Sequence, residues 1–102
     1  MNDRDQILQA IYRAVDELNR QLPPEQQLSR RPETVLVGPG AGLDSLGLIN
    51  LIVTTEQQVK EALEQTVNLT DGAYLENPEA TMRTLGHLAD SIARIIGRTS
   101  DD

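Results

Sequence analysis

The residues with the clearest chemical potential lie in one short segment, Gly40-Ala41-Gly42-Leu43-Asp44-Ser45-Leu46. Its glycines favour a loop, and Asp44 and Ser45 are residue types that begin helices. A serine in the first turn of a helix presents its hydroxyl near free backbone N–H groups and the positive end of the helix dipole, where a phosphate or phosphodiester is favoured. The segment therefore offers Ser45 as a site of phosphate chemistry, with a plain helix cap at Asp44-Ser45 as the structural alternative.

Three other kinds of site need residues that this segment lacks. A phosphate-binding P-loop needs Gly-Lys followed by Ser or Thr, and a dinucleotide-binding turn needs a preceding strand. A hydrolase elbow needs glycines two residues before and two after the nucleophile, but Leu43 stands two residues before Ser45. The single histidine, His87, falls opposite the apolar stripe of its predicted helix, so we expect it on the surface. We therefore expect no catalytic residue and no enzymatic activity.

The composition excludes further classes of function. The absence of Cys removes disulfides, thiolate metal sites and a thiol nucleophile, and one His cannot form a multi-histidine site, so we expect no metal. A net charge of −7 and only 2% aromatic residues argue against nucleic acid as a partner. The N-terminus lacks the pattern of a signal peptide, and no apolar run approaches the roughly 20 residues of a membrane span. We expect a cytoplasmic monomer without a membrane span.

Apolar residues recur at helical spacing in three segments, which predict long helices over residues 2–22, 46–66 and 84–97. A short helical segment is expected around residues 71–76. Residues 35–37 could form a short strand, but the sequence offers no second strand to pair with it. The sequence therefore predicts an all-α fold, a small four-helix bundle of three long helices and one short one. We expect a single domain over residues 1–102, with a core at about 3–98 and a polar tail at 99–102.

Proline and glycine mark the ends of these helices. Pro23-Pro24 should end the first helix, while Thr84 is a candidate cap for the last helix and Gly97 suits its end. Between the first two helices lies a long loop, residues 23–42, with no sustained period. A loop of this length in a small domain should carry function or be pinned by apolar anchors. The candidate anchors are Leu28, Val35, Leu36 and Val37.

The second predicted helix has an unusually wide apolar arc, which covers more than half of its circumference. One core contact does not require so much apolar surface. Either the helix is buried on two sides, or the part of the arc near its start is kept for a partner. The arc consists of Leu46, Leu48, Ile49, Leu51, Ile52, Val53, Val59 and Leu63.

With these elements in place, the chain resembles the acyl carrier proteins and related phosphopantetheine-binding carrier domains. The match rests on Gly42-Leu43-Asp44-Ser45-Leu46, which fits the Gly-x-Asp-Ser-Leu signature of that family. The signature follows an amphipathic helix and a long loop, and it precedes a helix, a short helix and a last helix that starts Thr84-Leu85-Gly86-His87-Leu88. The resemblance extends roughly from Ile7 to Ile96.

The resemblance implies a covalent cofactor on Ser45, a 4′-phosphopantetheine arm that a phosphopantetheinyl transferase moves from coenzyme A. The terminal thiol of the arm would hold an acyl or aminoacyl group as a thioester and carry it between loading and processing enzymes. Asp44 would help to position the serine and, during modification, the magnesium at the transferase. Leu46, Ile49 and Val53 would form an apolar docking strip, and Glu56, near that strip, is a candidate for pairing with a partner's Arg or Lys.

The chain departs from the family pattern directly after the serine. Where carriers of fatty-acid synthesis usually have acidic residues, this chain has Gly47 and Asn50, and residues 46–55 carry no charge. This departure favours a specialised, stand-alone carrier in a fatty-acid, polyketide or other dedicated biosynthetic pathway. Arg30-Arg31 in the long loop is the only adjacent basic pair, either solvated or in contact with the phosphate of the arm.

An alternative of a different class is a small acidic adaptor. Such a protein would bind a basic partner through Leu46, Ile49 and Val53, and Ser45 would be no more than a helix cap. Modification of Ser45 distinguishes the two hypotheses, because the adaptor does not need it.

Overall fold

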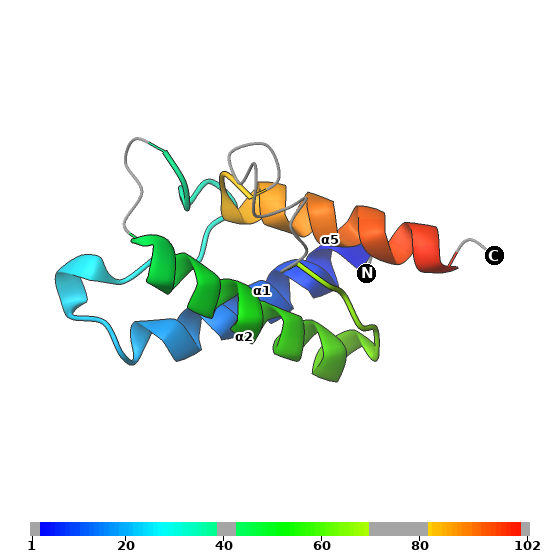
Figure 1. Ribbon diagram of the computed structural model, residues 1–102, viewed down its shortest axis with the longest axis horizontal. Coiled ribbons are helices and arrows are strands. Elements are labelled where there is room, and N and C mark those ends of the chain that lie inside the picture. Colours follow the sequence, from blue (N-terminus) through cyan, green and yellow to red (C-terminus); the bar gives the residue numbers. More distant parts are fainter. Residues whose placement is uncertain (1–2, 39–42, 70–81, 101–102) are drawn as a thin grey trace.

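The structure is a computed structural model, and it describes residues 3–38, 43–69 and 82–100. Its helices are α1 (Asp3–Asn19), α2 (Ser45–Leu63) and α5 (Leu85–Ser100), with a short 3₁₀ helix, η1 (Pro24–Gln26), between α1 and α2 (Figure 1). No strand occurs within the described ranges, so the predicted all-α class is confirmed. The three long helices were predicted. The expected short helix at residues 71–76 lies outside the described residues, and with it the predicted count of four.

Helix α1 forms the centre of the packing, because it contacts both α2 and α5. The spacing of its apolar residues puts Ile7, Ile11 and Val15 on one face, and all three are fully buried. The core is aliphatic, and burying each of its large side chains contributes about 1.5–3 kcal/mol. From α2 it receives Leu51, Ile52 and Val59, and from α5 it receives Leu85, Leu88 and Ile92.

The first two helices end slightly earlier than predicted. Helix α1 stops at Asn19, and the chain then turns through hydrogen bonds from the Gln21 N–H to the Leu18 carbonyl (2.9 Å) and from the Leu22 N–H to the Asn19 carbonyl (3.1 Å). Helix α2 stops at Leu63 because Glu64 takes a left-handed conformation, with φ of 55°. The end of the first helix was predicted from Pro23-Pro24 and that of the second from the apolar period, and neither signal reports these local turns.

Helix α5 runs further than predicted, to Ser100. The prediction that this helix ends at about Gly97 is therefore wrong. A glycine inside a helix costs about 1 kcal/mol relative to Ala, but it ends the helix only where it adopts a left-handed conformation. The start of α5 agrees with the prediction, because the Thr84 hydroxyl accepts a hydrogen bond from the His87 N–H at 3.1 Å.

The long loop before α2 is pinned at several points. Leu28 and Leu36 are buried, and Val35 and Val37 are partly buried, so the predicted anchors are confirmed. Val35 makes an isolated antiparallel bridge with Thr84 instead of a strand.

Backbone hydrogen bonds join this loop to the segment that leads into α5. The Leu36 N–H donates to the Arg83 carbonyl at 2.7 Å, and the Gly86 N–H donates to the Pro32 carbonyl at 2.9 Å. The approach at Gly86 is close, since a Cβ there would lie 3.2 Å from the Pro32 oxygen. The loop that leads towards Ser45 is therefore fixed against the last helix.

One ion pair connects the two helices that flank this junction. Arg4 on α1 donates from Nε to Oδ1 of Asp90 on α5 at 2.8 Å, and both side chains are about half exposed. The hydrogen bond to Asp90 raises the pKa of Arg4. Because the pair is exposed, we assign it a contribution of no more than about 1 kcal/mol. None of the helices in the described ranges combines the length and the apolar character that a membrane span needs.

Candidate functional site

The start of α2 is built by a capping interaction. Asp44 is the N-cap residue, with an extended backbone, and its Oδ1 accepts a hydrogen bond from the Gly47 N–H at 2.7 Å. Ser45 follows as the first residue of the helix, and its side chain lies outside the described part of the structure. The predicted helix start is confirmed. The N-cap residue is Asp44.

The capping geometry also explains the glycine two residues after the serine. A Cβ at Gly47 would lie 3.2 Å from Oδ1 of Asp44 and 3.2 Å from Cδ2 of Leu43. Both distances are tighter than ordinary van der Waals contact, so a larger residue would press on the cap. In the sequence, Gly47 stood out only as a departure from the family pattern.

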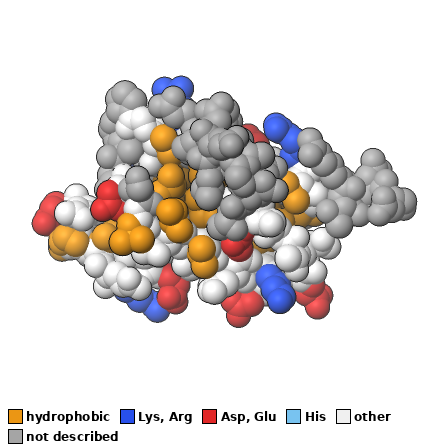
Figure 2. Space-filling model, viewed as in Figure 1, with side chains coloured by type: hydrophobic (Ala, Val, Ile, Leu, Met, Phe, Trp, Pro, Cys, Tyr) orange, Lys and Arg blue, Asp and Glu red, His pale blue; other side chains and the backbone are white. Residues whose placement is uncertain are grey.

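Three apolar side chains stand out from the surface next to this helix start. Leu46, Ile49 and Val53 are 68%, 42% and 39% exposed, and they are the exposed large hydrophobic residues of the described part of the chain. Their spacing of three and four residues places them on one face of α2. We call this set the apolar strip. Hydrophobic side chains gather in the left half of Figure 2, where Figure 1 places the first half of α2.

The rest of the wide apolar arc faces the core. Leu51, Ile52 and Val59 are fully buried on the other side of the helix. Helix α2 is thus divided into a core face and an exposed apolar face, and it is not buried on two sides. Single exposed apolar residues are normal, whereas these three large side chains form one exposed apolar group over about two helical turns.

Glu56 has a hydrogen-bonding role within the chain. Its side chain is half-buried, and Oε2 accepts a hydrogen bond from the backbone N–H of Leu69. This bond ties the segment after α2 back to the helix. One carboxylate oxygen is engaged in this way, and the pairing of Glu56 with a partner stays a prediction.

The adjacent arginines of the loop have different surroundings. Arg30 lies 3.7 Å from Oδ1 of Asp16, and its guanidinium carbon is 5.7 Å from the centre of the Tyr12 ring. Arg31 is exposed and lines a pocket formed by the loop. His87 is on the surface as predicted, with Nδ1 2.7 Å from the Thr84 hydroxyl oxygen.

The site is thus a helix start that carries a serine, next to an exposed apolar strip. In the described ranges, no three His, Asp or Glu side chains gather where they could hold a metal ion. Comparisons with protein-family models, with curated proteins and with solved structures find no match to this chain. The described residues form a small all-α fold with an exposed apolar strip on α2.

Proposed function

We propose that this chain is an acyl-carrier-type protein that bears a 4′-phosphopantetheine arm on Ser45 and carries an acyl or aminoacyl thioester between enzymes. The observation that carries the proposal is the apolar strip of Leu46, Ile49 and Val53, which begins one residue after Ser45 and stays exposed. A carrier needs its partners to dock beside the modified serine, and the strip offers a docking surface there. The Gly-x-Asp-Ser-Leu match and the order of the helices add to this support.

The attachment step balances with coenzyme A as the donor. A bond forms between the Ser45 hydroxyl oxygen and the phosphorus of the 4′-phosphate, and the phosphorus–oxygen bond of the diphosphate breaks. Adenosine 3′,5′-bisphosphate leaves, and the serine proton passes to a base of the transferase. The chain itself would supply the nucleophile, Ser45 at the first residue of α2, and the apolar strip beside it. Because the chain has no Cys, the thiol of the arm would be the only thiol of the modified protein.

The neutral first half of α2 supports a specialised carrier. Residues 46–55 carry no charge, although the chain as a whole has a net charge of −7. A partner that docks here would present an apolar surface. Basic residues of that partner would find few acidic side chains near Ser45 with which to pair. The magnesium-dependent transferase and the loading and processing enzymes are the partners we propose.

The test is to incubate the unmodified protein with coenzyme A, magnesium and a broad-specificity phosphopantetheinyl transferase, and to record its intact mass. We expect a gain of one phosphopantetheine group. Ser45→Ala should gain nothing, whereas Ser29→Ala, which removes an exposed hydroxyl in the loop, should gain one group. No gain in the wild type, or a gain in Ser45→Ala, would refute the proposal.

The second candidate is the adaptor, and the same apolar strip favours it. The adaptor binds a basic partner through Leu46, Ile49 and Val53 and does not need the serine hydroxyl. It is favoured if a partner binds wild type and Ser45→Ala equally well and Ser45 is not modified.

A further inference from the structure

Gly47 lies inside α2, two residues after Ser45, at a position whose backbone does not require a glycine. Among the described residues a positive φ occurs at Gly38 and Glu64, whereas Gly47 is helical. A glycine inside a helix costs about 1 kcal/mol relative to Ala. Space, and not backbone conformation, therefore explains why a residue without a side chain fits here.

Leu43 and Asp44 occupy the space that a side chain at Gly47 would need. A Cβ there would lie 3.2 Å from Cδ2 of Leu43 and 3.2 Å from Oδ1 of Asp44. Leu43 packs against the core, and Oδ1 of Asp44 is held by the Gly47 N–H at 2.7 Å, so neither atom moves away freely. An added methyl group would displace these residues, which directly precede Ser45, by a few tenths of an ångström.

The backbone of Ser45 is held from both sides by this first turn. The Asp44 carbonyl accepts a hydrogen bond from the Leu48 N–H at 2.9 Å. Leu43 and Leu48 stand at the two positions of a hydrophobic staple, which fixes the angle at which a chain enters a helix, and both pack against the core. The direction in which the chain passes through Ser45 is thus set by its neighbours.

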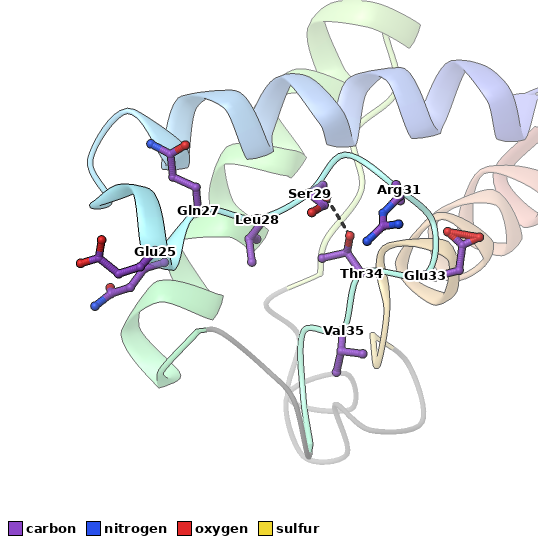
Figure 3. A pocket seen from close by; sticks show the side chains of 9 residues that line it. Glu25, Gln27, Leu28, Ser29, Arg31, Glu33, Thr34 and Val35 are labelled. Carbon is purple, nitrogen blue, oxygen red and sulfur yellow. Dashed lines mark hydrogen bonds between the residues drawn. The ribbon is translucent and has the colours of Figure 1, made fainter.

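The loop that precedes this turn is anchored separately. Figure 3 shows part of it, with the hydrogen bond from the Thr34 hydroxyl to the Ser29 carbonyl, at 2.7 Å, as the dashed line. Residues 39–42, between this loop and the turn, lie outside the described ranges. Within the described structure, the contacts nearest to Ser45 are therefore those of Leu43 and Asp44 with Gly47.

We infer that Gly47 is a positioning residue for the modification of Ser45, an inference that rests on the proposed function. Its missing side chain lets Leu43 and Asp44 close over the first turn of α2, and this packing sets the orientation in which the serine meets the transferase. A misplacement of about 1 Å can cost a hundredfold in rate, so a few tenths of an ångström should cost several-fold. Gly47 is not part of the apolar strip, so docking should not change.

The experiment measures initial rates of modification over a range of protein concentrations, with coenzyme A, magnesium and a broad-specificity transferase. We expect Gly47→Ala to lower kcat about three- to tenfold and to leave KM within about twofold of the wild type. A residue that matters only for stability would not produce this division between kcat and KM, provided that circular dichroism shows the variant to be folded.

Gly86→Ala is the matched control, because it is the same substitution at an equally crowded glycine of another helix. A Cβ at Gly86 would lie 3.2 Å from the Pro32 carbonyl oxygen and 3.3 Å from Nη2 of Arg4. These contacts belong to the junction between the loop and α5. Gly86→Ala therefore reports the effect of crowding away from the serine, and it should keep both kcat and KM within about twofold of the wild type.

A second variant tests the same packing from the other side. Leu43→Ala removes Cδ2 and loosens the entry of the chain into α2, so it should also lower kcat with little change in KM. In the Leu43→Ala background, Gly47→Ala should lower kcat by a smaller factor, because one of the two crowded atoms is gone. If Gly47→Ala does not fold, Leu43→Ala alone decides.

The outcomes separate this inference from the proposed function. A normal kcat in folded Gly47→Ala, an equal fall in Gly86→Ala, or a change confined to KM overturns the inference, while the proposed function stands because the wild type is modified. If Gly47→Ala does not fold, a normal kcat in Leu43→Ala overturns it in the same way. If the wild type is never modified, the proposed function fails and the inference fails with it.

Discussion

At the scale of single residues, Asp44 is the residue that fixes the start of α2. Its carboxylate satisfies the Gly47 N–H, which would otherwise lack a partner within the helix. Ser45 stands one position later and is not needed for this bond. The proposed modification of Ser45 would therefore leave the bond between Asp44 and Gly47 intact.

Because Asp44 and not Ser45 makes the capping hydrogen bond, substitutions at the two positions should differ in their effect on stability. Asp44→Ala should lower the free energy of unfolding by about 1 kcal/mol, because the cap is lost, while Asp44→Asn keeps the acceptor and should cost only a few tenths. Ser45→Ala should stay within about 0.5 kcal/mol of the wild type. Urea denaturation measures all three. A larger loss in Ser45→Ala than in Asp44→Ala would contradict this assignment of the cap.

Thr55 is a buried residue whose hydroxyl oxygen has no hydrogen-bond partner among the described residues. It lies on the core face of α2, between Ile52 and Val59. A buried polar group without a partner costs roughly 1–3 kcal/mol. Thr55→Val keeps the shape and removes the hydroxyl, so it should raise the free energy of unfolding by about 1 kcal/mol or more.

Thr55→Ser is the matched control, because it keeps the hydroxyl and removes the methyl group. It should lower the free energy of unfolding by about 1 kcal/mol. Thermal or urea denaturation compares the two variants. If Thr55→Val is the less stable of the two, the hydroxyl has a stabilising partner and this account of Thr55 is wrong.

At the scale of elements, the two apolar faces of α2 should respond differently to truncation. Leu51→Ala and Ile52→Ala remove fully buried side chains and should each cost about 2–5 kcal/mol. Leu46→Ala and Ile49→Ala shorten exposed side chains and should each stay within about 0.5 kcal/mol of the wild type. The substitutions Leu46→Ala and Ile49→Ala should instead slow modification of Ser45 by the transferase.

Urea denaturation and the initial rate of modification separate these two roles. Val53→Ala serves as a further member of the exposed set. Strong destabilisation by Leu46→Ala would mean that the apolar strip packs within the molecule. An unchanged rate in all three variants of the strip would mean that the transferase docks elsewhere.

The positions of the three long helices could be predicted from the sequence, because the spacing of apolar residues identifies a helix and its buried face. The width of the arc on α2 also predicted an exposed strip as one of two possibilities. The spacing of apolar residues does not report contacts between residues that are distant in sequence. The hydrogen bond from the Leu69 N–H to Glu56 and the one from the Leu28 N–H to the Asn19 side chain were therefore not predicted. The same limit applies to Arg30 and Arg31, which look equivalent in sequence and differ in surroundings.

At the scale of the whole molecule, an aliphatic core is combined with an apolar strip on α2 that stays exposed. The core is aliphatic, and the described helices pack around α1. The negative charge is distributed away from the first half of α2. The spacing of apolar residues predicted the all-α fold, but it could not show which part of the apolar surface remains exposed, because exposure depends on how the helices pack.

The central claim, that Ser45 accepts a thiol-bearing arm, is tested most directly by counting thiols in the folded protein with a colorimetric thiol reagent. The unmodified chain has no Cys and should give no thiol. After treatment with transferase, magnesium and coenzyme A, followed by removal of small molecules, we predict one thiol per chain. We predict none for Ser45→Ala. A wild-type protein that still gives no thiol, or a Ser45→Ala protein that gives one, would contradict the account.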